Sequence, residues 1–258
     1  MKTLTGRQKI VDTALGLIIP VSLVLILEFA TSREIISPVL IKPPRETALT
    51  FVDLVSSGEL WENLRVSLLR VFAGFVAGSS LGFVVGSFMG SSRRIEQYVA
   101  PLFHGVRQVA ILAWIPLLII MFGIGEGFRV VFIALSAFFP VALNTFEGVR
   151  GVPAEYLEVA KVFEYGKIRT LRKVIIPAAV PTVFVGLRLA LSMSWMAVIG
   201  AELIASSSGL GYMMTTGRTL FQQDVVMVGI VTIGSFGLLT DSVMKAVQTR
   251  LLGWRLTI

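Results

Sequence analysis

The sequence contains no cysteine, and His104 is the only histidine among its 258 residues. Without cysteine there is no disulfide framework, no thiolate nucleophile and no sulfur-ligated metal site. Charge is also scarce, because only 15% of the residues are Asp, Glu, Lys or Arg, against roughly 25% in an average soluble domain. These absences argue against a disulfide-stapled module, a cysteine enzyme and an ordinary soluble domain.

The chain is instead rich in apolar residues, with 55% hydrophobic residues and a mean hydropathy of +0.82. A helix that crosses a membrane needs about 20 mostly apolar residues. Segments that reach or approach this length, almost without charge, are 13–27, 71–92, 108–125, 130–146, 174–201 and 225–240. The sequence therefore predicts an all-α membrane protein with about six transmembrane helices.

The distribution of basic residues predicts the orientation of these helices. Lys and Arg gather before the first span, after the second, between the fourth and fifth, and after the last. Cytoplasmic loops carry an excess of Lys and Arg, so both termini are expected in the cytoplasm. The net charge of +7 then reflects topology. Nucleic acid is not expected as a partner, because no aromatic platform is interleaved with the basic residues.

The first apolar run follows a basic start, as in a signal peptide. No small-residue cleavage site follows Leu27, so residues 1–30 are expected to form the N-terminus and a retained first helix. Residues 31–64 are expected to form a periplasmic segment, in which Pro43 and Pro44 interrupt any continuous helix. Helically spaced apolar residues in 47–64 indicate surface helices, with a plain connector as the alternative.

The second span carries glycines at every fourth position: Gly74, Gly78, Gly82, Gly86 and Gly90. A bare helix face allows another helix to approach closely in lipid, so these glycines predict helix packing. Residues 78–82 also match the pattern G-x-S-x-G of serine hydrolases. That pattern requires a strand-to-helix turn with acid and histidine partners, and His104 lies within the expected third helix, so the hydrolase interpretation is rejected.

The loop of residues 152–181 is too long for a tight turn and too amphipathic for a linker. Pro153 suits a helix start, Gly166 suits a turn, and apolar residues recur at helical spacing on both sides. We expect a helix, a turn and a second helix on the cytoplasmic side. Such an apolar projection either docks on a partner protein or lies on anionic lipid headgroups, and the residues alone allow both.

The stretch Glu158-Val159-Ala160, with Val174-Ile175-Ile176-Pro177 at the matching distance, resembles the EAA loop of binding-protein-dependent ABC importer permeases. That loop has the pattern E-A-A-x3-G-x9-I-x-L-P. Further stretches, including 186–203 and 208–214, are similar to the subfamily that handles nitrate, taurine and alkanesulfonates. The resemblance covers roughly residues 55–250.

This resemblance implies a type I ABC importer permease fold in the bacterial cytoplasmic membrane. It implies a second permease copy, two ATP-binding subunits and a solute-binding protein as partners. A homodimer is expected, with a heterodimer as the rival. The chain has no G-x-x-x-x-G-K-[ST] motif to cradle phosphates, so ATP and Mg are expected on the partner ATPase and no cofactor in this chain. Residues 65–250 would form a five-helix core containing the coupling loop 152–177, and 251–258 a cytoplasmic tail.

The resemblance also assigns residues to ATPase coupling. The expected coupling residues are Glu155, Tyr156, Glu158, Val159, Ala160, Phe163, Glu164, Gly166 and Pro177. One position departs from the pattern, because the family glycine falls at Glu164. A left-handed backbone there is costly for a residue with a Cβ, so Gly166 is expected to take over the turn.

Polar residues at membrane depth are costly and therefore become candidates for the translocation pathway. They are Arg107, Asn144, Thr145, Arg188, Ser192, Ser194 and Glu202. Two arginines per subunit favour an anion such as a sulfonate or carboxylate. In the alternative, each arginine snorkels to headgroups or pairs with Glu96 or Glu147, and the two serines only pack. No metal site is expected. A membrane-embedded enzyme is not expected either, because the sequence shows no catalytic constellation. A scaffold or an exporter subunit remains as the other alternative.

Overall fold

The computed structural model describes residues 6–33, 35 and 41–252, with side chains from residue 18 onward except Pro20 and Lys167. Within these ranges the chain forms helices and no strand. Most of the expected tail 251–258 lies outside the described residues, as do residues 1–5, 34 and 36–40 of the expected N-terminal and periplasmic segments. The chain divides into two compact units.

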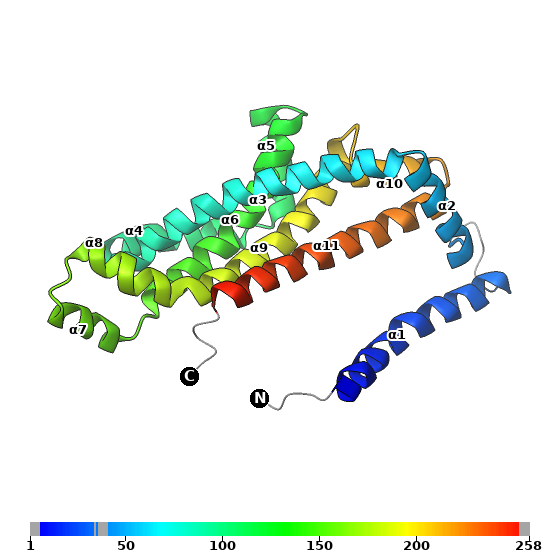
Figure 1. The fold of residues 1–258 in the computed structure, drawn as a ribbon. Coiled ribbons are helices and arrows are strands. Elements are labelled where there is room, and N and C mark those ends of the chain that lie inside the picture. The colour runs from blue at the N-terminus through cyan, green and yellow to red at the C-terminus, as the bar shows by residue number, and fades with distance from the viewer. Residues whose placement is uncertain (1–5, 34, 36–40, 253–258) are drawn as a thin grey trace. The chain divides into compact units, whose positions relative to one another are not determined.

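Four helical runs are long and apolar enough to cross a membrane. They are α3 (Glu59–Ser91), α6 (Glu126–Arg150), α11 (Gln223–Leu251) and the run Ile168–Ala205, which ends in α9 (Ile176–Ala205). The expected first span lies in α1 (Gly6–Ser32). A bent pair of helices, α4 (Arg93–Gln108) and the run Ile111–Phe122, forms one further candidate span (Figure 1). The prediction of an all-α membrane fold is therefore confirmed.

The expected span over 108–125 does not form one continuous helix. The helix α4 ends at Gln108, and the chain turns by 94° into the 3₁₀-helix η1 (Ile111–Trp114) and α5 (Ile115–Phe122). Pro116 lies in the first turn of α5, where its missing N–H is not needed. Gly123 ends α5 with a φ of 71°, a backbone conformation that glycine adopts without steric cost.

The smaller unit contains α1, α2 (Pro44–Ser56) and Met213–Val231, together with the first residues of α3. The backbone N–H of Arg45 donates to Glu28 Oε2 at 3.2 Å, which ties α2 to α1. The hydroxyl of Thr50 donates to Asp224 Oδ2 at 2.6 Å, which ties α2 to α11. Two helices, α2 and the start of α3, thus occupy 47–64, and the plain connector is excluded.

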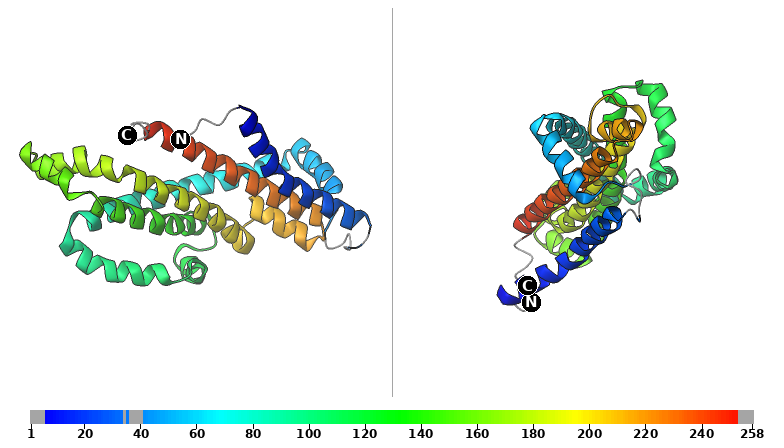
Figure 2. Two further views of the ribbon diagram at one scale, coloured as in Figure 1. Left: turned by 90° about the horizontal axis from the view of Figure 1, so that it is seen from below. Right: turned by 90° about the vertical axis from the view of Figure 1, so that its right-hand side faces the viewer.

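The larger unit is built around α6, which packs against α9 along its length (Figure 2). Their shared core includes Phe128, Phe132, Trp195 and Val198. Past the end of α6 the chain forms α7 (Ala154–Val162), turns, and continues through α8 (Lys167–Thr170) and the π-helix η2 (Leu171–Ile175) into α9 (Figure 1). The second arm of this helical hairpin is therefore continuous with a membrane helix.

The glycine face of α3 lies directly against α6. A Cβ on Gly78 would lie 2.1 Å from the carbonyl oxygen of Ala134, and one on Gly86 would lie 2.3 Å from that of Ala142. Gly74, Gly82 and Gly90 meet α6 at comparably short distances. Because lipid gives no hydrophobic drive between helices, this backbone contact is what holds α3 to α6.

Replacing Gly78 with Ala should weaken the permease core. The methyl group would meet backbone, which cannot yield as a flexible side chain does, and overpacking typically costs about 1–3 kcal/mol. A Cβ on Gly105 meets nothing within 4 Å, so Gly105→Ala in α4 is the matched control. Thermal unfolding in detergent should show a lower midpoint for Gly78→Ala only. Equal midpoints would contradict the close contact.

Candidate functional site

The hairpin of α7 and α8 presents apolar side chains outward. Val162 is 83% exposed, Ile168 75% and Phe163 66%, and Tyr156 and Val159 are about half exposed. Ala160, by contrast, is buried at 2% exposure. The acidic residues Glu155 and Glu158 are exposed on the same helix. An apolar surface of this kind at a helix hairpin is typical of a binding site.

The turn after α7 closes in a Schellman arrangement. The N–H of Tyr165 donates to the carbonyl of Ala160 at 2.9 Å, and that of Glu164 donates to Lys161 at 2.9 Å. This arrangement places its C′ residue in the left-handed region, and Glu164 has a φ of 51°. The expectation that Gly166 takes over the turn is therefore wrong, because the hydrogen-bond pattern fixes the position of the left-handed residue.

Aromatic and basic side chains brace the same turn. The guanidinium of Arg169 lies 5.0 Å from the centroid of the Tyr165 ring, and the ammonium of Lys173 lies 5.8 Å from it. The rings of Phe163 and Tyr165 are 5.9 Å apart. These contacts join the two arms of the hairpin, so its exposed surface is held in one shape.

A network of charges, buried except for the Glu126 side chain, which is 62% exposed, lies where α3, α6 and α9 meet. Arg70 is 3% exposed and donates from Nε and Nη2 to Glu126 at 2.8 and 2.5 Å. Its Nη1 donates to Glu202 Oε1 and to the carbonyl of Ser208, both at 2.8 Å. The hydroxyl of Ser208 accepts a further bond from Nη2 at 3.1 Å. All five N–H donors of the guanidinium are thus used.

Glu202 is the anionic centre of this network. It is 1% exposed and accepts bonds from the hydroxyl of Ser67 at 2.8 and 2.9 Å and from the N–H of Gly211 at 2.9 Å. Gly209 has a φ of 106°, and a Cβ on it would lie 2.3 Å from the carboxylate. The loop after α9 can therefore close over Glu202 only with glycine at this position.

Arg129 extends the network to the end of α9. Its Nε and Nη2 donate to the carbonyl of Ala205 at 3.0 and 2.5 Å, and its Nη1 donates to Glu126 at 2.6 Å. A cation near the last carbonyls of a helix is favourable because it meets the negative end of the helix dipole. Two arginines and two glutamates balance one another, so the cluster carries no net charge.

The sequence-predicted pathway residues fall into two groups. Glu202 belongs to the buried network, and Ser194 and Thr145 are 0% exposed. Ser194 donates to the carbonyl of Ala190 at 2.8 Å, and the amide of Asn144 donates to that of Pro140 at 2.8 Å. Glu202, Ser194 and Thr145 are thus packing and network residues in this structure, and their place in the pathway stays a prediction.

The other predicted pathway residues are accessible. Arg107 and Ser192 are exposed, and Arg188 is partly exposed. Arg188 forms an ion pair with Asp241 on α11, at 2.8 Å, and not with Glu96 or Glu147. Among the described residues, no acidic oxygen lies within ion-pair distance of Arg107. The structure does not bring all seven candidates together in one site.

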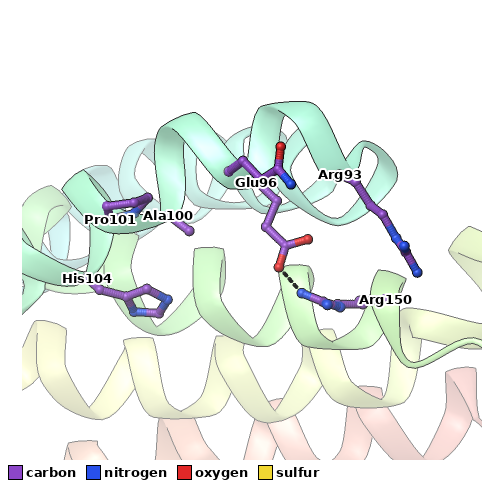
Figure 3. A pocket seen from close by; sticks show the side chains of 7 residues that line it. Arg93, Glu96, Ala100, Pro101, His104 and Arg150 are labelled. Carbon is purple, nitrogen blue, oxygen red and sulfur yellow. Dashed lines mark hydrogen bonds and ion pairs between the residues drawn. The ribbon is translucent and has the colours of Figure 1, made fainter.

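A shallow pocket of about 530 Å³ lies between α4 and the end of α6. Figure 3 shows Glu96 reaching from α4 towards Arg150 on α6, with which it forms an ion pair, and His104 further along α4. Arg150 also lies over the Phe146 ring. This pair fixes the last turn of α6 directly before the α7 hairpin. No group of three or more metal-binding side chains occurs in the described part of the chain.

Sequence reasoning missed Arg70, Glu126, Arg129 and Asp241. Arg70 directly precedes the apolar run 71–92, Arg129 directly precedes 130–146, and Glu126 lies three residues before Arg129, so all three fall outside the predicted spans. Asp241 follows 225–240 in the same way. A charge at the edge of an apolar run is the only signal that the sequence offers for these residues.

Comparison with known proteins decides the family. Residues 74–253 match the family described as "Binding-protein-dependent transport system inner membrane component". The chain belongs to this family. It is a transport permease, and its helices form the membrane part of an ABC transporter.

Several relatives carry related names. An aliphatic sulfonates transport permease protein, SsuC, of Bacillus subtilis is 40% identical over 93% of this chain and 87% of its own. The taurine transport system permease protein TauC of Escherichia coli is 32% identical over 86% and 82%. The bicarbonate transport system permease protein CmpB of Synechococcus elongatus is 35% identical over 75% and 70%.

Among solved structures, a chain of the MetNI methionine ABC transporter in inward-facing conformations is similar. It matches with a TM-score of 0.58 and 18% identity, over 70% of this chain and 92% of that chain. At this identity the likeness concerns the fold alone, which is that of a type I ABC importer permease.

Removing the charge of Glu202 should destabilise the permease. Taking away one member of a buried ion pair typically costs about 3–5 kcal/mol, because the other charge stays buried. Glu202→Gln keeps the shape, so the loss would report charge. Glu147 is exposed, and Glu147→Gln should leave the unfolding midpoint in detergent unchanged. A Glu202→Gln protein as stable as the parent would rule out the network as a stabilising element.

The turn after α7 gives a second prediction. A left-handed residue with a Cβ costs about 1–2 kcal/mol, so Glu164→Gly should slow amide hydrogen exchange in the peptide 158–168 about fivefold. Glu164→Ala keeps the Cβ and should change little. Gly166→Ala should be tolerated, since its Cβ would meet open space. Faster exchange in Gly166→Ala than in Glu164→Gly and the parent would place the left-handed turn at Gly166 instead.

Proposed function

We propose that this permease imports a small organic or inorganic anion as a homodimer, driven by two separate ATP-binding subunits and supplied by an external solute-binding protein. The observation that carries the proposal is the exposed apolar surface of the α7 hairpin, in a chain without a phosphate-binding loop. The transport names of the relatives, for sulfonates, taurine and bicarbonate, support an anionic solute. ATP and Mg would be bound by the partner subunits.

The α7 hairpin suits the role of an energy-transmitting contact. Its apolar surface comprises Tyr156, Val159, Val162, Phe163 and Ile168, which are all at least half exposed. The run from Ile168 to Ala205 is continuously helical over 38 residues. Movement of the ATP-binding subunits would therefore be carried along a helix into the membrane. Such movement would bias an equilibrium between inward-facing and outward-facing states.

The break between α4 and α5 supports a pathway at the centre of a dimer. Irregular backbone at membrane depth is tolerated only where protein covers it or where it lines a water-filled cavity. The break lies at Val109 and Ala110, and Arg107 lies two residues before it without an ion pair within the described part of the chain. A second copy of the permease, with a water-filled pathway between the two copies, would give this irregular backbone and Arg107 a hydrated surface to line.

The proposed setting is the bacterial cytoplasmic membrane, with the α7 hairpin and both termini in the cytoplasm. The basic residues of the hairpin support this orientation, since Arg169, Arg172 and Lys173 lie close to its apolar surface. The residues around α2 would then lie on the opposite side, where the binding protein delivers the solute. The chain itself would carry out no chemical reaction.

Reversing the charge of Glu158 should uncouple transport. Glu158 is exposed on α7, so Glu158→Lys should leave folding intact while placing a cation against the ATP-binding subunit. In the reconstituted complex we expect solute-stimulated ATP hydrolysis and uptake to fall at least tenfold, because hot-spot changes at interfaces cost about 2 kcal/mol or more.

The control is Glu62→Lys, an equally exposed charge reversal on α3. It should leave uptake near the parent rate. Native mass spectrometry of the same preparation should find one permease species in two copies. Normal coupled uptake by Glu158→Lys would overturn the assignment of α7 as the ATPase contact, and two different permease chains would overturn the homodimer.

A further inference from the structure

An ion pair joins α9 to α11, at Arg188 within the apolar run 174–201 and at Asp241 directly after the apolar run 225–240. Arg188 donates from Nε to Asp241 Oδ1 at 2.9 Å and from Nη2 to Oδ2 at 2.8 Å. The Arg188 side chain is 37% exposed and that of Asp241 38%. The indole N–H of Trp195 donates to the hydroxyl of Thr240 at 3.0 Å, which braces the same two helices beside the pair.

The exposure of this pair is the unusual feature. In the network at Arg70 three of the four charged side chains are buried and only Glu126 is exposed, whereas this pair leaves more than a third of both side chains uncovered. Charges at membrane depth face a water-filled cavity or the interior of a bundle, because lipid does not solvate them. Because both side chains are partly exposed, the pair fits a hydrated surface better than a lipid-facing one.

One edge of the Arg188 guanidinium remains available to a ligand. Nε and Nη2 hold the carboxylate, and within the described part of the chain Nη1 has no hydrogen-bond partner. The Nη1 group carries two donors in the plane that suits an anionic oxygen. Asp241 thereby fixes the direction in which the remaining donors point.

Two further polar side chains extend the ion pair along the two helices. Ser192 lies one turn after Arg188 on α9, and Lys245 lies one turn after Asp241 on α11, and both are exposed. Residues four apart share a helix face, so Ser192, Arg188, Asp241 and Lys245 form a polar row along the seam of α9 and α11. With two cations and one anion, the row carries a single positive charge.

We propose that this α9–α11 polar row is a contact site for a small oxyanion, such as a sulfonate, as it crosses the permease. Arg188 contacts the anion through Nη1, and Asp241 is the positioning residue that orients the guanidinium and offsets its charge. A lone arginine would hold an anion tightly, and the paired one lets it leave. The inference rests on the proposed import of an anion and adds the residues that meet it.

The cysteine-free chain permits a direct test. In the assembled importer, reconstituted in lipid nanodiscs, Ser192→Cys supplies a single thiol in the permease. Its rate of modification is measured by mass spectrometry of the permease chain, with 2-sulfonatoethyl methanethiosulfonate and with its trimethylammonium counterpart. The parent permease, which has no thiol, is the blank, and each rate is normalised to that of a free small thiol.

We expect the sulfonate reagent to react faster than the cationic one. Removing one unit charge within about 7 Å should change the ratio of the two rates about fivefold. Asp241→Asn, made in the Ser192→Cys background, should raise the ratio, and Arg188→Gln should lower it. Because Arg188→Gln leaves Asp241 unpaired and can fail to assemble, Lys245→Gln is the second variant, and it should lower the ratio while leaving the pair intact.

Two results would overturn the proposal. Absence of reaction with either reagent, in the resting and the nucleotide-bound importer, would mean that lipid or a second copy covers the row. Reaction at equal rates, or a ratio that Asp241→Asn and Lys245→Gln leave unchanged, would mean that the row does not select anions. Uptake and ATP hydrolysis by the parent importer are measured separately, so failure of the proposed function is distinguishable from failure of this site.

Discussion

In lipid no water reaches a buried charge, so the guanidinium of Arg70 must find all its partners inside the protein. It finds them on Glu126, Glu202 and the loop at Ser208. Because these partners come from α6, from α9 and from the segment that follows α9, one side chain of α3 determines where three other segments lie. The loop after α9 closes only because Gly209 leaves room for the Glu202 carboxylate.

The close contact of α3 with α6 stabilises the parts of these helices that the charge network does not reach. The network holds one end of these helices, and the glycine face holds their length, where carbonyl oxygens of α6 occupy the space that side chains of α3 would otherwise need. The hydrogen bonds and ion pairs of the network fix the orientation of the helices, and the backbone packing supplies contact area between them. The α7 hairpin follows the end of α6, where the ion pair of Arg150 with Glu96 fixes the last turn.

Much of this arrangement could be predicted from the sequence, because lipid imposes simple patterns. Apolar length revealed the spans, and the four-residue glycine period revealed a packing face. The bend after Gln108 escaped prediction, since an apolar run shows length and not direction. The partners of Glu202 escaped prediction for a different reason: Ser67 and Arg70 are distant in sequence, and nothing local distinguishes a buried, paired carboxylate from one that meets solute.

The turn at Glu164 shows the same limit on a smaller scale. A residue's own preference pointed to Gly166, whereas the hydrogen bonds of Glu164 and Tyr165 to α7 set the left-handed position two residues earlier. Local propensity is a weak guide where a recurring hydrogen-bond pattern decides the geometry.

The π-helix η2 lies between the α7 hairpin and α9. A π-turn holds one residue more than an α-turn, and one residue of an α-helix corresponds to a rotation of about 100° about its axis. The extra residue therefore sets the azimuth at which the hairpin leaves the membrane helix. A residue gained or lost there would point the apolar surface of the α7 hairpin in another direction, so the length of this short segment is part of what orients that surface.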